Sequence, residues 1–180
     1  MSAFRVLTIG HSTRPIDVFI DLLLRHRVRL LADVRRFPGS RTQPQFKREA
    51  LSAALADADI GYEWMEALGG RRPARPDSHN TRWRNASFRG YADYMETPPF
   101  ASALAHLETR ADAERTAIMC AELLWWRCHR ALVSDALQVR GRPVAHIGPE
   151  GELIAHPYTS AARIQGDRLR YDEDRGETLF

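Results

Sequence analysis

The stretch FRVLTIGHSTRPIDVFIDLLLRHRVRLLADV, residues 4–34, indicates the fold class more clearly than any other part of the chain. It starts with a short apolar run at 4–9 and ends with another at 28–34, and both have the length of a buried strand. Between these runs, Ser12 or Thr13 is expected to cap a helix that carries Pro15 in its first turn. The apolar residues of this helix recur on one helical face, and they are Ile16, Phe19, Ile20, Leu23 and Leu24.

The rest of the chain repeats this alternation of strand and helix. Strands are expected at 61–65, 116–120 and 143–147, with a short edge strand at 151–157, and helices at 46–58, 89–110 and 128–139. The segment 66–87 is rich in Gly, Pro and Arg and is interpreted as a long loop. The pattern predicts one α/β domain over 1–180, a mostly parallel, doubly wound sheet of about five strands with helices on both faces, Rossmann-like or flavodoxin-like. Residues 165–180 are interpreted as a charged C-terminal tail, either frayed or forming a last edge element.

The composition excludes few classes of protein, but together with the first residues it indicates the cellular location. At 180 residues and 44% hydrophobic residues, the chain has the size and composition of one globular domain. No apolar run approaches the roughly 18 residues of a membrane helix, so no membrane association is expected. The first residues do not have the pattern of a signal peptide, which favours a cytoplasmic protein with reduced thiols.

The charged residues are unusual in kind rather than in number. The formal net charge is only +3, yet of the 26 basic residues Lys47 alone is a lysine. Arginine binds phosphate and carboxylate through a planar fork and stacks on aromatic rings. A GC-rich genome is an alternative explanation for the excess of arginine. In 35–94, arginines alternate with aromatic residues, which suits either a solvated loop surface or contacts with phosphates and bases.

Several reactive residue types follow directly after the expected strands. Because parallel strands end at one edge of the sheet, these residues are expected to converge there, where doubly wound sheets bind ligands. A cluster that contains His, Cys, Glu and Arg together suggests a functional site rather than ordinary polar loops. The residues expected at this edge are Gly10, His11, Ser12, Asp33, Arg35, Cys120, Glu122 and, with less support, His146.

The segment CAELLWWRCHR, residues 120–130, contains both cysteines of the chain. Seven residues separate Cys120 from Cys128, which disfavours a zinc clip of the C-x2–4-C type. Cys128 and His129 are adjacent and are expected to point in different directions on a helix, so no metal site is predicted. A C-x5-R phosphatase loop is also absent. Cys128 at a helix start beside His129 and Arg130 has the surroundings of a reactive thiol, although a buried structural cysteine is the simpler interpretation.

The motifs taken together resemble those of the DUF488 family. They are TIGHSTRP, LADVRRFPGSR, QF, LGGRR, NASFRGYADYM and CAELLWWRCHRALVSDAL, in this order, between Phe4 and about His156. The resemblance implies an α/β fold. It also implies that the family's recurrent residues fall on Gly10, His11, Ser12, Asp33, Val34, Arg35, Cys120, Glu122, Cys128, His129 and Arg130. Because this family has no established function, the resemblance leaves the activity open.

The leading hypothesis is a pocket or enzyme for a small anionic ligand that contains a phosphate or resembles a nucleotide. In this hypothesis the anion is held by Gly10, Ser12, Asp33, Arg35, His129 and Arg130, and the catalytic candidates are Glu122, Cys120, Cys128 and His11. The first alternative is a module that binds nucleic acid or a modified base without catalysis. The second is a thiol or metal-dependent switch. Neither GxGxxG nor GxxxxGK[ST] is present, so the sequence identifies no cofactor, and it leaves the oligomeric state open.

Overall fold

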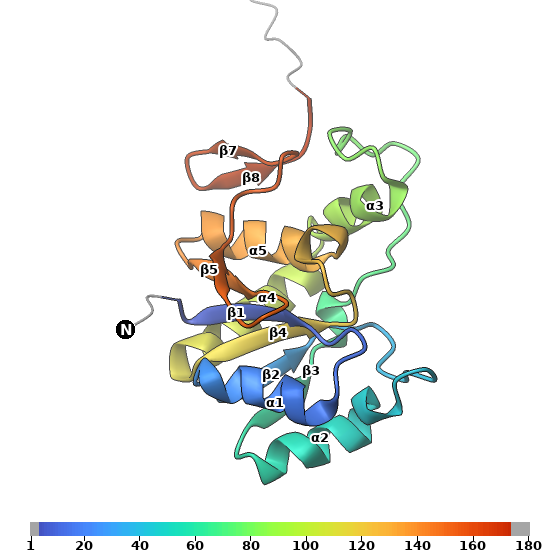
Figure 1. The fold of residues 1–180 in the computed structure, drawn as a ribbon. Coiled ribbons are helices and arrows are strands. Elements are labelled where there is room, and N and C mark those ends of the chain that lie inside the picture. The colour runs from blue at the N-terminus through green and yellow to red at the C-terminus, as the bar shows by residue number, and fades with distance from the viewer. Residues whose placement is uncertain (1–3, 174–180) are drawn as a thin grey trace, which may run out of the picture.

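A central sheet with helices on both of its faces forms the protein (Figure 1). The computed structural model describes residues 4–173. The strands are β1 Val6–Gly10, β2 Leu30–Asp33, β3 Gly61–Trp64, β4 Thr116–Cys120, β5 Val144–Ile147, β6 Leu153–Ala155, β7 Arg163–Gln165 and β8 Arg168–Arg170. The helices are α1 Ile16–Arg25, α2 Arg48–Asp57, α3 Ala86–Tyr94, α4 Pro98–Ala113 and α5 Arg130–Val139, with short 3-10 turns η1 Pro44–Phe46, η2 Glu66–Leu68 and η3 Trp125–Arg127. This confirms the predicted α/β class.

The six-stranded sheet has the order β3-β2-β4-β1-β5-β6. Five of its strands are parallel, and β6 pairs antiparallel with β5 at one edge. The register pairs Gly10 with Cys120 and Asp33 with Met119, so β1, β2 and β4 end almost level with one another. The order differs from the 3-2-1-4-5-6 order of the dinucleotide-binding fold, because β4 lies between β1 and β2.

The faces that the helices cover follow from the order of the strands. From β1 to β2 and β3 the chain moves across the sheet in one direction, and the connecting helices α1 and α2 lie on one face (Figure 1). From β3 to β4 and β5 it moves back, and α4 and α5 lie on the other face. A right-handed crossover requires this change of face when the direction reverses. The chain leaves β1 and β2 toward the face of α1 and α2, whereas it leaves β4, which lies between them, toward the face of α5. A crevice is therefore expected at the carboxyl end of β4.

Two apolar cores, one on each face of the sheet, hold the helices in place. Successive strand residues point to opposite faces, so Val6 packs into the core beneath α4 and α5 while Leu7 packs into the core beneath α1 and α2. Phe19, Leu51 and Leu55 fill the second core from the helices, and all three are fully buried. The predicted coverage of both faces is confirmed.

Two local predictions about helix starts are wrong. Neither Ser12 nor Thr13 caps the first helix, because α1 begins at Ile16 with Pro15 at its N-cap and no side-chain cap bond. Ser12 instead adopts a left-handed backbone conformation with φ of 47° in the turn after β1. Cys128 is not in the last predicted helix either. The turn η3 precedes it, its backbone is extended, and α5 begins two residues later.

The C-terminal part of the described chain folds over α5. β7 and β8 form a separate antiparallel hairpin, which Figure 1 shows beyond α5 and away from the main sheet. Tyr171 follows this hairpin and donates its hydroxyl hydrogen to Asp135 Oδ2 on α5 at 2.8 Å. Of the charged tail predicted at 165–180, residues 174–180 lie outside the described residues. None of the helices in residues 4–173 has the length and apolar character needed to cross a membrane.

The long loop between η2 and α3 is fixed by one buried carboxylate. Asp93 on α3 accepts hydrogen bonds from the backbone N–H of Arg75, the hydroxyl of Ser78 and the amide of Asn80, at 2.8, 2.5 and 2.8 Å. Asn85 ends the loop, and its side chain caps α3 by accepting the N–H groups of residues 87 and 88. The loop therefore has a defined conformation where it borders the carboxyl edge of the sheet.

Candidate functional site

A pocket of about 540 Å³ lies at the carboxyl edge of the sheet, where β1, β2 and β4 end. We call it the carboxyl-edge pocket. It is lined by His11, Ser12, Thr13, Arg35, Phe37, Gly39, Ser40, Arg41, Thr42, Gln43, Arg71, Ala121, Glu122 and Leu123. A smaller cavity of about 180 Å³ adjoins it, which we call the cysteine cavity. That cavity is lined by Arg35, Arg36, Phe37, Gly70, Arg71, Cys120, Ala121 and His129. The structure therefore brings together His11, Arg35 and Glu122, which the sequence places after three separate strands.

Arg35 is held rigidly at the boundary of the two cavities by Asp33. The carboxylate of Asp33 accepts bonds from Nε and Nη2 of Arg35 at 2.9 and 2.7 Å, and from its backbone N–H at 3.1 Å. Tyr62 donates a fourth bond to Asp33 at 2.6 Å. Burial alone lowers the pKa of Arg35, but the bonds to Asp33 outweigh it and keep that pKa raised. This fork orients Arg35 and leaves Nη1 as the group that faces away from Asp33.

His11 lies against that free end of Arg35. Its Nδ1 is 2.8 Å from the carbonyl oxygen of Ser12, and since a carbonyl only accepts, Nδ1 carries the hydrogen. Nε2 then presents a lone pair, toward which Arg35 Nη1 donates at 3.4 Å. The ring stacks on Phe46 with centroids 4.3 Å apart. Burial, with added repulsion from Arg35, lowers the pKa of His11 to about 4, so the imidazole is neutral at pH 7.

The turn after β4 is packed tightly against the end of β1. A Cβ on Gly10 would lie 2.1 Å from the carbonyl oxygen of Glu122, so this position requires glycine. The N–H groups of His11 and Ser12 donate to the carbonyls of Cys120 and Ala121 at 2.9 and 3.0 Å. These contacts fix the positions of Ser12 and Glu122 relative to each other in the pocket wall.

Glu122 presents an exposed carboxylate at the pocket wall. Its side chain accepts a hydrogen bond from the N–H of Leu124 at 3.4 Å. Among the described residues, neither Arg35 nor Arg130 forms an ion pair with this carboxylate. The carboxylate is therefore free to meet a ligand.

Arg130 has a different place from the one predicted. It is 1% exposed, lines neither cavity, and donates from Nη2 to the carbonyls of Glu122 and Leu123 at 2.5 and 3.4 Å. Its position supports the turn after β4 from behind. A direct contact of Arg130 with a ligand in the carboxyl-edge pocket is not compatible with this burial, which corrects the predicted binding role.

Cys120, Cys128 and His129 form a compact cluster behind the cysteine cavity. Ligand atoms from the three side chains all lie within 4.8 Å of one another. Cys128 Sγ is 3.6 Å from His129 Nδ1, although the two residues are adjacent in the chain. The expectation that they point apart is wrong, because extended backbone at Cys128 replaces the assumed helix. The two cysteines are close in space although seven residues lie between them in the sequence, because the turn η3 brings the chain back to the end of β4.

The surroundings shift the pKa values of the two thiols in opposite directions. A hydrogen bond to Cys128, together with burial, raises the pKa of Cys120 well above its usual value. Burial also raises the pKa of Cys128, but the Cys120 hydrogen bond and the charges of His129 and Arg130 outweigh it and lower this pKa. His129 Nε2 lies 3.0 Å from the carbonyl oxygen of Val34 and therefore donates to it. Cys120 and His129 line the cavity, whereas Cys128 is buried behind them.

His146 is part of a separate buried chain of hydrogen bonds and is absent from the lining of both cavities. Thr8 Oγ1 lies 2.7 Å from His146 Nδ1, His146 Nε2 lies 2.8 Å from His156 Nδ1, and His156 Nε2 lies 2.9 Å from Asp135 Oδ1. Since a carboxylate only accepts, each histidine donates toward Asp135 and accepts from the side of Thr8. Burial lowers the pKa of His146 to about 2, and Trp125 stacks on its ring at 4.2 Å. The expected place of His146 at the sheet edge is therefore wrong.

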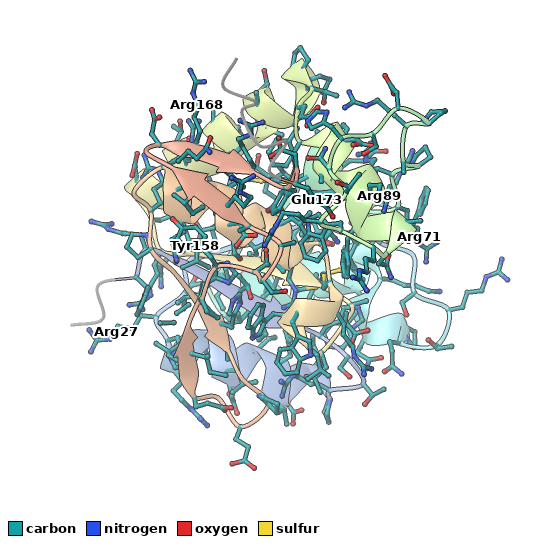
Figure 2. The ribbon with its side chains drawn as sticks, turned by 90° about the horizontal axis from the view of Figure 1, so that it is seen from above. Arg27, Arg71, Arg89, Tyr158, Arg168 and Glu173 are labelled. Atoms are coloured by element: carbon teal, nitrogen blue, oxygen red, sulfur yellow. The ribbon has the colours of Figure 1, made fainter. Side chains whose placement is uncertain are left out.

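The aromatic side chains in and after the long loop pack against other residues and are not exposed to solvent as a group. Trp83 contacts Phe88 and Tyr171, with centroids 5.0 and 5.6 Å apart, and Tyr91 is 1% exposed. The surface arginines do not gather on one side. Figure 2 shows Arg71 and Arg89 on one side of the molecule and Arg27 and Arg168 on the other. Phe37, which is 63% exposed beside Arg36 and Arg71, is the main exception at the pocket mouth.

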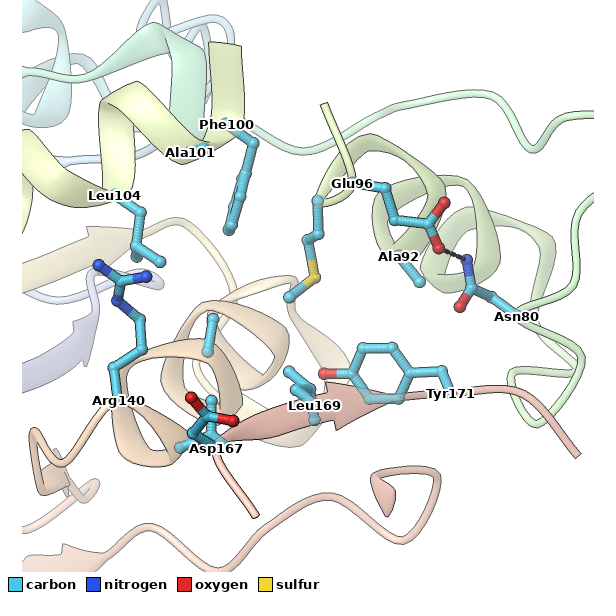
Figure 3. A pocket seen from close by; sticks show the side chains of 13 residues that line it. Asn80, Ala92, Glu96, Phe100, Ala101, Leu104, Arg140, Asp167, Leu169 and Tyr171 are labelled. Carbon is cyan, nitrogen blue, oxygen red and sulfur yellow. Dashed lines mark hydrogen bonds between the residues drawn. The ribbon is translucent and has the colours of Figure 1, made fainter. Parts of the chain in front are cut away.

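Another cavity, of about 240 Å³, lies between α3, α4, α5 and β8 (Figure 3). Met95, Phe100 and Leu104 give it an apolar wall, and the side-chain amide of Asn80 donates to Glu96 at 2.9 Å on its rim. It has no residue in common with the strand ends. Its lining is that of an incompletely filled core under the C-terminal hairpin, so the candidate site is the carboxyl-edge pocket.

Sequence reasoning missed part of that pocket. Ser40, Arg41, Thr42 and Gln43 line it from the loop between β2 and η1, and Arg71 lines it from the loop after η2. The signal was present as a run of hydroxyl, amide and guanidinium groups in GSRTQ at 39–43. Strand ends alone do not predict which of the following loop residues fold back over the site.

The fold and the pocket together define a single-domain α/β protein with a polar cavity at the carboxyl ends of parallel strands. A family model described as "Domain of unknown function DUF488" matches residues 15–137, and the chain belongs to this family. The matched segment contains Asp33, Arg35, Cys120 and Glu122 as well as 128–130, whereas Gly10, His11 and Ser12 precede it. No curated protein and no solved structure matches the chain.

Proposed function

We propose that the carboxyl-edge pocket binds a small anionic ligand through a phosphate group and positions it for reaction. The observation that carries this proposal is the Asp33–Arg35 fork, which holds a guanidinium with 6% exposure at the pocket wall. Asp33 accepts two bonds from the guanidinium and one from the backbone N–H of Arg35, and Nη1 has a second N–H beside the one directed at His11, so that N–H is preorganised for a ligand. A rigid guanidinium suits phosphate oxygens and loses little entropy on binding.

The charge of the pocket lining favours an anion. Arg35, Arg41 and Arg71 contribute three positive charges, and Glu122 contributes the one carboxylate of the lining. His11 adds no charge at pH 7, because its pKa is lowered to about 4 by burial. The hydroxyl groups of residues 12, 40 and 42 supply further donors for phosphate oxygens.

Size and shape favour a ligand of nucleotide dimensions. The volume of about 540 Å³ is within the range of small-molecule sites. Phe37 presents an exposed aromatic face at the mouth, between Arg36 and Arg71, and such a face can stack on a base. A phosphate at Arg35 with a planar group against Phe37 would use both ends of the pocket.

The reactive groups in this proposal are Glu122 and Cys120. Glu122 has an exposed carboxylate at the wall and serves as a general base or holds a donor group of the ligand. His11 Nε2 accepts from Arg35 Nη1 and helps to hold that nitrogen at the pocket wall. Cys120 reaches the adjoining cavity, and Cys128 acts through it because Cys128 is buried.

Thermal unfolding with inorganic phosphate, pyrophosphate, AMP and ribose 5-phosphate tests the proposal. A ligand at a hundred times its Kd adds about 2.7 kcal/mol, which raises the Tm of a chain of this size by roughly 5–10 °C. The double substitution of Arg41→Ala and Arg71→Gln, both exposed residues, should remove the shift without lowering the Tm of the free protein. Arg168→Ala, on the hairpin, is the matched control and should keep it. Absence of a shift with all four probes, or an equal shift in the double variant, would overturn the proposal.

Binding of nucleic acid without catalysis is the alternative function. It has less support, because Trp83 and Phe88 are partly buried in contact with one another and Tyr91 is fully buried, which leaves Phe37 as the exposed aromatic at the pocket mouth. This alternative predicts binding of single-stranded or duplex DNA that weakens steeply with salt. A titration at low salt with DNA against AMP separates the two functions.

A further inference from the structure

We propose that Cys120, Cys128 and His129 bind one Zn²⁺ ion, with the fourth coordination position open to the cysteine cavity. Two thiolates and an imidazole are a donor set that zinc favours, and a three-residue set leaves one position for water or a ligand. This metal centre shares Cys120 and Cys128 with the proposed function, where they would then act as metal ligands, but it does not depend on that function, because it needs neither Arg35 nor a bound anion.

The distances in the cluster are close to those of a tetrahedral site. Zinc bonds of about 2.3 Å to sulfur and about 2.0–2.1 Å to nitrogen place the two ligand atoms about 3.5 Å apart. Cys128 Sγ and His129 Nδ1 are 3.6 Å apart. The three ligand atoms lie within 4.8 Å of one another, so shifts of about 1 Å bring them onto a common ion.

The surroundings orient the ligands as metal sites require. His129 Nε2 donates to the carbonyl of Val34 at 3.0 Å, which leaves the Nδ1 lone pair on the side of the sulfur atoms. Metal-bound histidines commonly donate their second ring nitrogen in this way. The backbone N–H of Arg130 lies 3.5 Å from Cys128 Sγ and supports a negatively charged sulfur.

Gly70 leaves room for the ion. A Cβ on this residue would lie 2.8 Å from His129 Nδ1, so even a methyl group would press on the coordinating nitrogen. Gly70 and Arg71 also line the cysteine cavity, so an open metal position would face the guanidinium groups of Arg35, Arg36 and Arg71. Water or an anionic oxygen fits that position.

Zinc binding releases protons from the cluster. Zn²⁺ binds the two cysteines as thiolates, so binding displaces up to two thiol protons from the free cluster. Zinc affinity should therefore rise with pH by up to a hundredfold per unit while both protons are bound.

Metal analysis of protein purified under reducing conditions tests the site. We expect about one zinc per chain in the wild type and a loss of most of it in Cys128→Ser and in His129→Ala. Gly70→Ala should also lose zinc, although it removes no ligand. Gly39→Ala is the matched control, since a Cβ there meets nothing within 4 Å, and it should stay fully loaded. Zinc that remains in the two ligand variants would overturn the proposal.

A second measurement uses the unmodified protein, so that it does not depend on how the variants fold. Chelated wild type titrated with Co²⁺ should develop a thiolate-to-cobalt charge-transfer band and the visible bands of a tetrahedral site, saturating at one ion per chain. Absence of these bands, together with no zinc in the purified protein, would overturn the proposal. If zinc binds while no phosphate probe shifts the Tm, the metal centre stands and the proposed function fails.

Discussion

Asp33→Asn should lower the free energy of unfolding by about 3–5 kcal/mol, the usual cost of breaking a buried ion pair. The structure shows how this cost arises. In the variant, Oδ1 can still accept the backbone N–H and Nε of Arg35. An amide NH₂ then replaces Oδ2, where the Nη2 group of Arg35 and the hydroxyl of Tyr62 both donate. Loss of a charged bond costs about 1.5–3 kcal/mol and loss of a neutral one about 1 kcal/mol, and the Arg35 charge stays buried without a partner.

Urea unfolding followed by tryptophan fluorescence measures this effect. With a slope of about 2 kcal/mol/M, the midpoint should fall by about 2 M with the slope unchanged. Asp112→Asn is the matched control, because Asp112 pairs with Arg142 at the surface with 58% exposure, and it should leave the midpoint nearly unchanged. Adding Arg35→Met to Asp33→Asn should restore part of the loss, since the unpaired charge is then removed. A cost below about 1 kcal/mol, or no recovery in the double variant, would refute the role of the fork.

Three further predictions concern packing, pH and the C-terminal segment. Gly10→Ala should cost about 1–3 kcal/mol in urea unfolding, because its Cβ would overlap the turn after β4, whereas Gly39→Ala should cost little. The pKa of His11 is lowered to about 4 from 6.5. The unfolded chain therefore takes up this proton first, and unfolding free energy should fall as the pH drops from about 6.5 to about 4. His11→Gln should show a shallower fall, and the same slope in both proteins would contradict the assignment. Asp135→Asn removes an acceptor used by His156, Thr159 and Tyr171, so limited proteolysis should cut the segment 157–173 faster than in wild type.

The parts of the fold that sequence predicts well are those fixed by short-range patterns. β1, β2 and β4 are buried on both faces, so they read as continuous apolar runs, and parallel pairing then places their ends together. The convergence of His11, Arg35 and Glu122 on one pocket follows from that rule alone. The family model over 15–137 covers the motifs that carried the resemblance except TIGHSTRP at 8–15, of which it includes only the last residue.

The errors arise where distant or irregular segments decide the outcome. A 3-10 turn at residues 125–127 keeps Cys128 extended, so helical spacing does not describe its relation to His129. His146 is buried because His156, which directly follows β6, completes its hydrogen bonds. Asp135 lies on the apolar face of α5, and its partners come from 21 to 36 residues away along the chain. No local pattern predicts such contacts, although an acid on an apolar helix face signals a buried partner.

Diffraction from a crystal soaked in tungstate tests the central claim most directly, because the heavy atom marks where a tetrahedral oxyanion binds. We expect a tungstate in the carboxyl-edge pocket, with an oxygen about 3 Å from Arg35 Nη1 and others near the hydroxyl groups of residues 12 and 40. Tungstate bound to other arginines, with none at Arg35, would contradict it.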